Sequence, residues 1–154
     1  MHGTSLCPEH LESNARFSDQ FNSVILLFLQ RSGAAYMYPP ATHFASSDPS
    51  PALPPMGMRL RLRSSYNCTS ALSSAPQARA ICIALQLYGM ILADNGGDGA
   101  ISGLADPRWD DVDLARLRGI PLSLFDAVET GAVLCTDPAC SSASFAGGAV
   151  GSFA

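Results

Sequence analysis

Six prolines stand between Pro39 and Pro55, and they restrict what the first half of the chain can form. Proline has no backbone N–H and a fixed φ, so it breaks the interior of a helix and is kept out of central strands. Residues 36–58 are therefore predicted to cross the domain as an ordered extended segment or a loop. The regular elements must come from the residues on either side of this crossing.

Apolar spacing predicts strands on both sides of the crossing. Residues 58–63 read MRLRLR, an alternation that turns Leu60 and Leu62 to one face and the three arginines to the other. This pattern is typical of a half-buried strand. Residues 22–30 are apolar without a clear period, so a strand and a short buried helix both remain open there.

The middle of the chain carries the start and stop signals of a helix. Ser74 can cap its first turn, Pro76 suits that turn, and Gln77 stands three residues after the cap. Gly89 follows the last apolar position, where a left-handed residue ends many helices. One face collects the apolar side chains Ala78, Ile81, Cys82, Leu85 and Tyr88. The spacing predicts a largely buried helix at about 76–88.

Further elements are predicted after this helix. Met90–Ala93 is a short buried strand, the sequence DNGGDG is a turn with positive φ at its Asn-Gly and Asp-Gly pairs, and residues 100–102 return as the partner strand. Asp110 can cap a second short helix at about 111–118, whose first turn is acidic and whose last turn is basic. Residues 125–129 are predicted to form a last strand.

These elements predict an α+β fold. It is a small β-rich domain with one buried helix at about 76–88, one short helix at about 111–118 and an irregular proline-rich crossing. The chain has 154 residues, of which 47% are hydrophobic, which is enough for one modest core. The residues from about Gly131 onward are mostly Gly, Ser and Ala, so this tail is expected to be loose.

Charge and hydropathy argue against two classes of partner. The formal net charge is −4 and the basic cluster is limited to the three arginines of residues 58–63, whereas binding to nucleic acid needs a basic surface. The longest unbroken apolar run, Val24–Leu29, is far shorter than the ~20 residues of a membrane span. No signal peptide is visible, because the N-terminal region is acidic and lacks a basic start.

Five cysteines leave at least one thiol free or paired with another molecule. Cys135 and Cys140 frame a turn and can close a small disulfide. A zinc site at these two residues would need a second Cys or His pair at a matching distance, which the sequence lacks. Cys82 is interpreted as a small buried hydrophobe. Asn67 starts an Asn-Cys-Thr sequon for N-glycosylation, which matters only in an exported chain.

Carboxylates and one histidine are the candidates for catalysis. His43, Asp94, Asp110 and Asp111 can supply a general acid and base, or paired carboxylates for glycoside cleavage. Asp94 follows a buried strand, a common place for a catalytic acid and equally for an aspartate that starts a turn. Nothing in the sequence brings the four together. The chain has no Gly-x-Ser-x-Gly elbow, P-loop or dinucleotide fingerprint, so no cofactor is expected.

A calcium site and a glycan site are two further hypotheses, and a purely structural role explains the same residues in each case. Asp94 and Asp98 match part of a calcium loop, but Gly96 and Ala105 occupy two positions where ligands are needed, and an Asp/Gly turn explains the same residues. Trp109, the only tryptophan, can pack a turn against the core or bind a glycan.

Seven short motifs lie in order along the middle of the chain. They are ATHFAS at 41–46, PPMG at 54–57, RLRL at 59–62, YGM at 88–90, ADNG at 93–96, ISG at 101–103 and RWDD at 108–111. In order and spacing this part of the chain resembles a family of uncharacterised, mostly predicted-secreted proteins of bacteria and some eukaryotes. That family has no established activity. The resemblance implies an extracellular location and a longer protein whose last part this chain covers.

The resemblance also sets the expected boundaries. It implies a family-like domain at 36–130 that lacks a preceding half, with an unassigned segment at 1–35 and the tail at 131–154. The chain departs from the family at two places. Thr42 stands where the family has an arginine before its histidine, and Asp98-Gly99-Ala100 stand where it has an aromatic residue. Both groups are therefore missing from any site that used them.

Together these observations predict a non-catalytic C-terminal module of a secreted-type protein, associated with a glycan or the cell envelope. Its other expected partner is the missing N-terminal half. The alternative is a fragment of a glycoside-type hydrolase that uses the Asp and His candidates.

Overall fold

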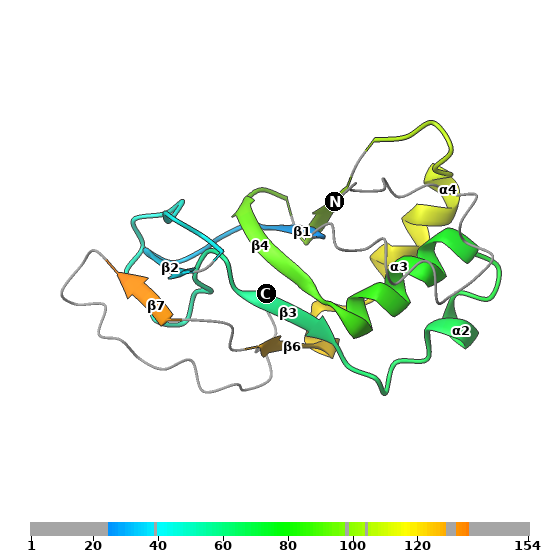
Figure 1. The fold of residues 1–154 in the computed structure, drawn as a ribbon, viewed down its shortest axis with the longest axis horizontal. Helices are drawn as coiled ribbons and strands as arrows, with labels where there is room; N and C mark the ends of the chain where they lie inside the picture. The colour runs from blue at the N-terminus through cyan, green and yellow to red at the C-terminus, as the bar shows by residue number, and fades with distance from the viewer. Residues whose placement is uncertain (1–24, 39, 98, 104, 129–131, 136–154) are drawn as a thin grey trace, which may run out of the picture.

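The computed structural model describes residues 25–38, 40–97, 99–103, 105–128 and 132–135, and these form an α+β fold, as predicted. Figure 1 shows a two-stranded sheet at one end of the molecule, the helices at the other end, and a five-stranded sheet between them. The order in the larger sheet is β5-β1-β4-β3-β6, and β2 pairs with β7 in the smaller one.

The elements have the following bounds. The strands are β1 (Leu26–Leu29), β2 (Ala35–Tyr38), β3 (Arg59–Leu62), β4 (Met90–Asn95), β5 (Ala100–Ser102), β6 (Phe125–Val128) and β7 (Ala132–Cys135). The helices are α2 (Cys68–Ala71), α3 (Pro76–Leu87) and α4 (Asp111–Leu114), and two 3₁₀ segments follow them, η2 (Ala115–Gly119) and η3 (Leu122–Leu124).

A parallel pair of strands forms the centre of the larger sheet. β1 lies beside β4, with Leu26 opposite Ile91, and the side chain of Leu27 is fully buried. The segment that was open between strand and helix is therefore a strand. β1 also lies N-terminal to the boundary expected at residue 36, so the folded unit extends beyond the 36–130 range.

The partner of residues 100–102 differs from the prediction. β5 pairs with β1, with Ile101 opposite Leu27, and β4 lies on the other side of β1. The hairpin is wrong because the apolar β1 occupies the place beside β4 that the exposed β5 was expected to take. The segment after β4 must cross roughly 10 Å over β1, since each strand adds about 4.8 Å to a sheet. Gly99 takes a positive φ of 67°, whereas Asn95 remains in β4.

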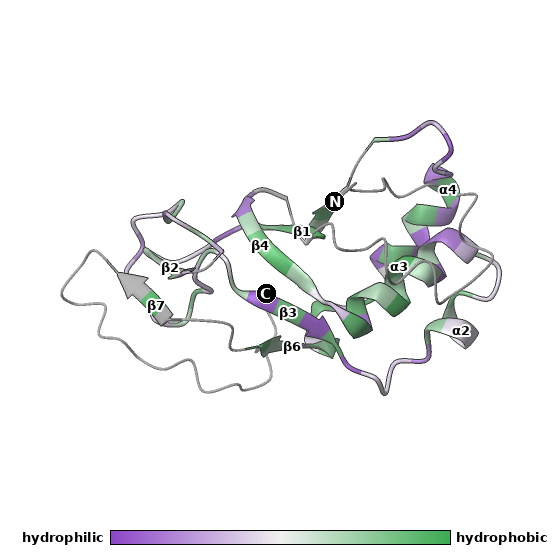
Figure 2. Cartoon of the chain, in the orientation of Figure 1, coloured by the Kyte–Doolittle hydropathy of each residue, from purple (hydrophilic) through white to green (hydrophobic). Residues whose placement is uncertain are grey.

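Strand β3 confirms the alternation of its sequence. Leu60 and Leu62 are 1% exposed, and the arginine between them faces solvent. The same alternation is visible as green and purple bands along β3 in Figure 2. Beyond its end, Arg63 Nη2 lies 2.7 Å from Asp126 Oδ1 on β6, and this hydrogen bond lowers the pKa of Asp126. β6 itself confirms the strand predicted at 125–129 over its described residues.

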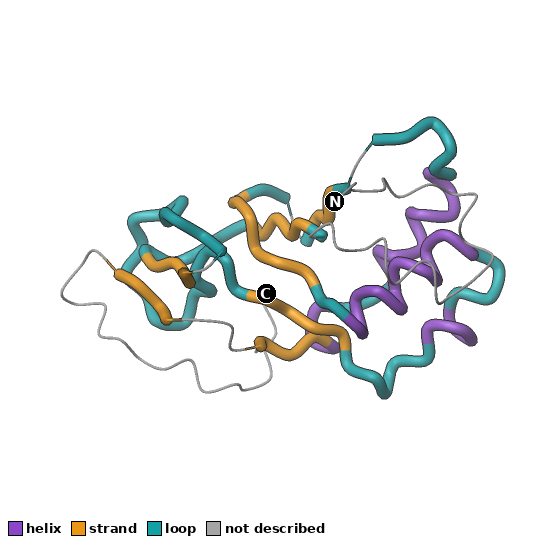
Figure 3. Tube along the Cα trace, viewed as in Figure 1, coloured by secondary structure: helices purple, strands orange, loops and turns teal. Residues whose placement is uncertain are grey.

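The proline-rich crossing is ordered against β2. Met37 donates its backbone N–H to Met56 O at 2.7 Å, and Met56 donates to Ala35 O at 3.0 Å. Pro54 and Pro55 are fully buried. In Figure 3 this crossing is drawn as a loop that lies beside β2. Residues 36–38 of the predicted crossing belong to β2 in the two-stranded sheet. The other described residues of the crossing form no helix or central strand, as predicted.

Helix α3 starts at Pro76, but its cap is not the one predicted. The N-cap position is Ala75, which makes no side-chain cap bond, and Ser74 lies outside the helix. Asp113 of α4 caps the helix instead, because its carboxylate accepts from the backbone N–H of Gln77 at 3.1 Å and of the next residue at 2.8 Å. The prediction of a Ser74 cap was wrong because a carboxylate from a distant segment satisfies these donors.

Helix α4 begins at the cap that the sequence predicts. The Asp110 carboxylate accepts from the backbone N–H of Val112 at 2.8 Å and of Asp113 at 3.2 Å. The Gln77 side chain joins this turn to α3: its Oε1 accepts from the N–H of Asp110 at 2.8 Å, and its Nε2 donates to Arg108 O at 3.1 Å. The first turns of α3 and α4 therefore interlock. The predicted helix is present, although its second half is the 3₁₀ segment η2.

The buried face of α3 matches the predicted face except at its end. Cys82 and Leu85 are 0% and 2% exposed, but Tyr88, expected on the same face, is 39% exposed. The difference arises because the chain turns away directly after the helix, at Gly89 with a φ of 76°. A Cβ atom at Gly89 would collide with the backbone oxygen of Leu60, so glycine is required there.

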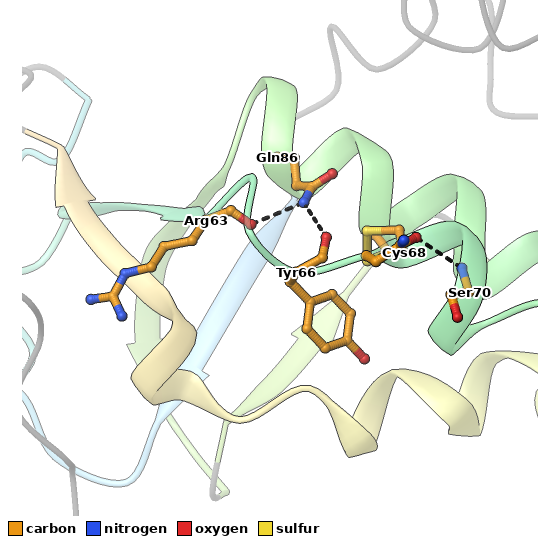
Figure 4. Close-up of a disulfide and its surroundings, with 7 residues drawn as sticks. Arg63, Tyr66, Cys68, Ser70 and Gln86 are labelled. Carbon is orange, nitrogen blue, oxygen red and sulfur yellow. Dashed lines mark hydrogen bonds between the residues drawn. A yellow bond between two sulfur atoms is a disulfide. The ribbon is translucent and has the colours of Figure 1, made fainter.

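A disulfide joins α2 to α3 (Figure 4). Cys68 and Cys82 are bonded, with their Cα atoms 5.8 Å apart, and both are buried. Cys82 is therefore not simply a small hydrophobe, because apolar periodicity does not distinguish a buried thiol from a cross-link. Gln86 holds the loop before α2 against α3, since its Nε2 donates to Arg63 O at 2.9 Å and to Tyr66 O at 2.8 Å.

Strand β7 lies in the segment that was expected to be loose. It pairs antiparallel with β2, with Cys135 opposite Ala35 and Ala132 opposite Tyr38. Residues 132–135 are therefore ordered by the backbone of β2, and the described elements extend past the boundary expected at residue 130. The remainder of the tail lies outside the described residues.

Replacing both Cys68 and Cys82 by alanine should destabilise the chain. Loss of a cross-link with a sequence separation of 14 residues is expected to lower the free energy of unfolding by about 3 kcal/mol, because the unfolded chain regains conformational freedom. Urea titration measures the change. The wild-type chain in reducing buffer is the control and should match the double variant. Equal stability of the oxidised, reduced and double-variant chains would contradict the prediction.

Asp113→Ala should destabilise α3 through a residue that is distant in sequence. The variant loses the cap on two backbone N–H groups, and the expected loss is about 1 kcal/mol. Asp111→Ala is the matched control, because it removes an acid from the same turn of α4 and should lose only about 0.5 kcal/mol of helix-dipole stabilisation. Urea titration of both variants measures the difference. Equal losses would show that the charge matters and the cap does not.

Candidate functional site

A groove of about 1060 Å³ lies between the helices and the edge of the larger sheet. Side chains of α3, α4 and η2 line it together with β5. The deep part is apolar and includes Leu85 and Met90, which are each 2% exposed. The solvent-facing part includes the polar side chains of Ser102, Asp111 and Arg118. A ligand can therefore meet apolar surface and hydrogen-bonding groups in one place.

The turn before α4 brings Trp109 to this groove. The Asp106 carboxylate accepts from Arg108 three times: from the backbone N–H at 2.9 Å, from Nε at 2.8 Å and from Nη2 at 2.7 Å. The backbone N–H of Trp109 donates to the backbone oxygen of Asp106 at 3.1 Å. Trp109 is half-buried and packs against the core, as one of its two predicted roles required, and it also lines the groove.

Hydrogen bonds from Arg108 keep the Asp106 carboxyl ionised. The hydrogen bonds from the Arg108 side chain, followed by the one from its backbone, lower the pKa of Asp106 to about 2. The carboxylate is thus negative at every physiological pH. It can accept hydrogen bonds from a ligand, but it does not hold a proton that it could donate.

The two aspartates at the start of α4 have different surroundings. Asp110 uses its carboxylate to cap the helix, as described above, and does not line the groove. Asp111 is exposed and lines the groove. Of the four catalytic candidates, Asp111 is thus the one that the groove includes.

His43 and Asp94 lie elsewhere, near the C-terminal end of β4. Asn95 Nδ2 donates to Ala45 O at 3.2 Å, which brings the loop that carries His43 to this end of the strand. Asp94 Oδ1 accepts from the Asn95 N–H at 2.7 Å, and His43 Nδ1 lies 3.4 Å from Thr42 Oγ1. Figure 1 shows that β4 points away from α4. The four candidates therefore divide into two groups, and the structure brings no catalytic set together among its described residues.

The metal hypotheses find no complete ligand set in the described part of the chain. Asp98 lies outside the described residues. Ile101, which would take the apolar position inside a calcium loop, belongs to strand β5. No group of three or more His, Cys, Asp or Glu side chains gathers among the residues that the structure describes. The Cys135–Cys140 disulfide also lies outside them, because Cys140 and the side chain of Cys135 are not described.

The groove contains features that the sequence did not single out. Asp106 lies in the turn that carries Trp109, Ser102 belongs to the strand predicted at residues 100–102, and Arg118 belongs to the basic end of the helix predicted at about 111–118. Their common location depends on β5 pairing with β1, which no local pattern indicates. The one signal available was the Asp-Pro-Arg-Trp turn, where an acid and a base two residues apart stand directly before the only tryptophan.

No protein-family model, no curated protein and no solved structure matches this chain. The resemblance to the predicted-secreted family therefore stays a prediction. None of the helices that the structure describes has the length and apolar character needed to cross a membrane.

The ion pair of Asp106 should give the stability of the chain a pH-dependent component. Because its pKa in the fold is about 2, below the ordinary value of 3.8, the carboxylate stabilises the fold above about pH 4 and loses this effect as the pH falls toward about 2. In Asp106→Asn this component is absent. The difference in Tm between wild type and variant should therefore be constant near neutral pH and shrink between about pH 4 and pH 2. A difference that keeps its size throughout acid titration would contradict the assigned ion pair.

Proposed function

We propose that this chain is a non-catalytic module of an exported protein and that it binds an extracellular or cell-envelope glycan at the groove beside Trp109. The observation that carries the proposal is the combination at the groove of an indole ring with the polar side chains of Asp106, Asp111 and Arg118. The four side chains come from one turn and the short helical segment that follows it.

The chemistry of these side chains suits a sugar. An indole ring offers an apolar face on which the C–H groups of a pyranose can lie. Carboxylates accept hydrogen bonds from hydroxyl groups and a guanidinium donates them, and such charge-assisted bonds are stronger than neutral ones. The acid of Asp106 is permanently charged and held by Arg108, so the acceptor is in place before a ligand arrives.

Export is supported by the buried Cys68–Cys82 bond. Disulfides of this kind persist in oxidising compartments and are rare in the cytosol, where thiols stay reduced. The bond links two elements of the folded domain and is inaccessible, which is typical of a structural cross-link. This argument is independent of the family resemblance and points to the same location.

The surroundings of the carboxylates favour binding over hydrolysis. A glycosidase needs a carboxylic acid that holds a proton near neutral pH and a second carboxylate about 5–9.5 Å away. Asp106 has the opposite property, since its pKa is lowered to about 2. Asp110 is occupied as a helix cap. Asp106 and Asp110 are therefore unsuited to the role of general acid, and the hydrolase alternative stays a prediction.

A polysaccharide titration tests the proposal, with the fluorescence of Trp109 as the readout. Because Trp109 is the only tryptophan, a ligand that enters the groove should change its emission. Asp111→Ala should weaken the affinity about tenfold, the effect of losing one hydrogen bond to a charged group. Val112→Ala is the matched control, because Val112 is the next residue, is 77% exposed and does not line the groove.

Thermal melts of both variants confirm that the fold is intact. A panel of cell-wall and extracellular polysaccharides that leaves the emission of Trp109 unchanged would count against the proposal. So would a binding signal that Asp111→Ala and Val112→Ala reduce equally.

A further inference from the structure

One tripeptide at the start of α2 carries two sites of covalent chemistry. Asn67, Cys68 and Thr69 form an N-glycosylation sequon, and the middle residue is bonded to Cys82. The outer two side chains are exposed, whereas Cys68 is 4% exposed and turns inward. The side chains of Asn67 and Thr69 are therefore open to solvent, where a modifying enzyme can reach them, whereas the side chain of Cys68 belongs to the core.

The folded form leaves the reactive nitrogen of Asn67 accessible. Asn67 caps α2 through its oxygen, because Oδ1 accepts from the Ser70 N–H at 2.9 Å. Among the described residues no acceptor bonds to its Nδ2. A glycan on Nδ2 would thus project into solvent and leave the cap intact. Once attached, it should be compatible with the disulfide and the fold.

The folded form nevertheless hinders the attachment reaction. A glycosyl-transfer enzyme must surround the amide of Asn67 and the hydroxyl of Thr69 together. In the structure this backbone is already helical, since Ala71 donates to Asn67 O at 2.9 Å. The disulfide anchors the middle residue to α3, and the Gln86 side chain holds the preceding loop there (Figure 4). The enzyme can enclose the sequon only before these contacts form.

We propose that N-glycosylation of Asn67 and closure of the Cys68–Cys82 disulfide compete in a secretory pathway that transfers N-glycans. If the disulfide closes first, Asn67 stays bare; if the glycan is attached first, the disulfide can still close. The order of two reactions therefore sets the fraction of chains that carry a glycan. This proposal rests on the export proposed above and does not depend on glycan binding in the groove.

Both reactions balance with co-reactants of known chemical class. In the transfer, Asn67 Nδ2 forms a C–N bond to the anomeric carbon of a lipid-pyrophosphate oligosaccharide, the C–O bond to the pyrophosphate breaks, and the amide loses a proton. In the closure, the thiols of Cys68 and Cys82 lose two electrons and two protons, and the disulfide of an oxidoreductase is reduced to a dithiol.

The test is expression of the full chain behind a secretory leader in a eukaryotic host. The occupied fraction of Asn67 is measured from the mass shift on enzymatic removal of N-glycans. Wild type should be partly glycosylated, and Cys82→Ala, which keeps the sequon unchanged, should raise the occupied fraction severalfold. Thr69→Ala should abolish the glycan, which assigns the signal to Asn67.

Asp113→Ala separates the disulfide from general instability. This variant weakens the start of α3 and leaves both cysteines in place, so its occupied fraction should stay close to that of wild type. An equal rise in Asp113→Ala and Cys82→Ala would overturn the proposal, because unfolding alone would explain it.

Two other outcomes would also overturn it. Complete glycosylation of wild type would show that closure does not compete, and absence of glycan from both wild type and Cys82→Ala would show that Asn67 is not an acceptor. Because the leader supplies export in this experiment, neither outcome bears on the groove. The polysaccharide titration tests the groove separately.

Discussion

The parallel pairing of β1 with β4 is the contact on which the rest of the sheet depends. β1 presents one edge to β4 and the other to β5, so the central strand and one wall of the groove are both positioned by it. The ladder partners of β5 in the described chain all lie on β1. Leu27 of β1 and Leu92 of β4 are both almost inaccessible, which means that this pair also carries the middle of the core. The chain that connects β1 to β4 contains β3 and α3. The pairing of β1 with β4 therefore also holds α3 beside the sheet.

Elements whose signals lie within a dozen residues could be predicted from the sequence. Alternation placed Leu60 and Leu62 in the core, Asp110 marked the start of α4, and Gly89 marked the end of α3. Each of these depends on the geometry of one local segment: the period of a strand, the free N–H groups of a helix start, and the left-handed residue after a helix. The α+β class followed from them.

The features that the sequence did not predict all join distant segments. Ser74 is a suitable local cap, yet Asp113 takes that role. Asp113 accepts from the backbone N–H of Ala78, which lies 35 residues before it in the sequence. Cys82 fits the apolar face of α3, and only the position of α2 reveals its bond to Cys68. Ala100–Ser102 fits a hairpin, but the more apolar β1 takes the inner place. In each case the local signal was genuine and a non-local partner offered a better contact.

The interlocked helix starts support the binding role proposed for the groove. Gln77 and Asp113 tie the first turns of α3 and α4 together, and Gln77 also bonds to Arg108, the residue that holds Asp106. The turn that carries Trp109 is thus fixed from both of its ends by hydrogen bonds that exist without ligand. A turn held in this way and a permanently ionised carboxylate would lower the ordering cost of the proposed binding, because the backbone of the turn has little conformational freedom left to lose. The same fixed charge is a poor basis for general acid catalysis, which requires a proton held near neutral pH. These contacts therefore support the proposed binding role of the groove over the hydrolase alternative.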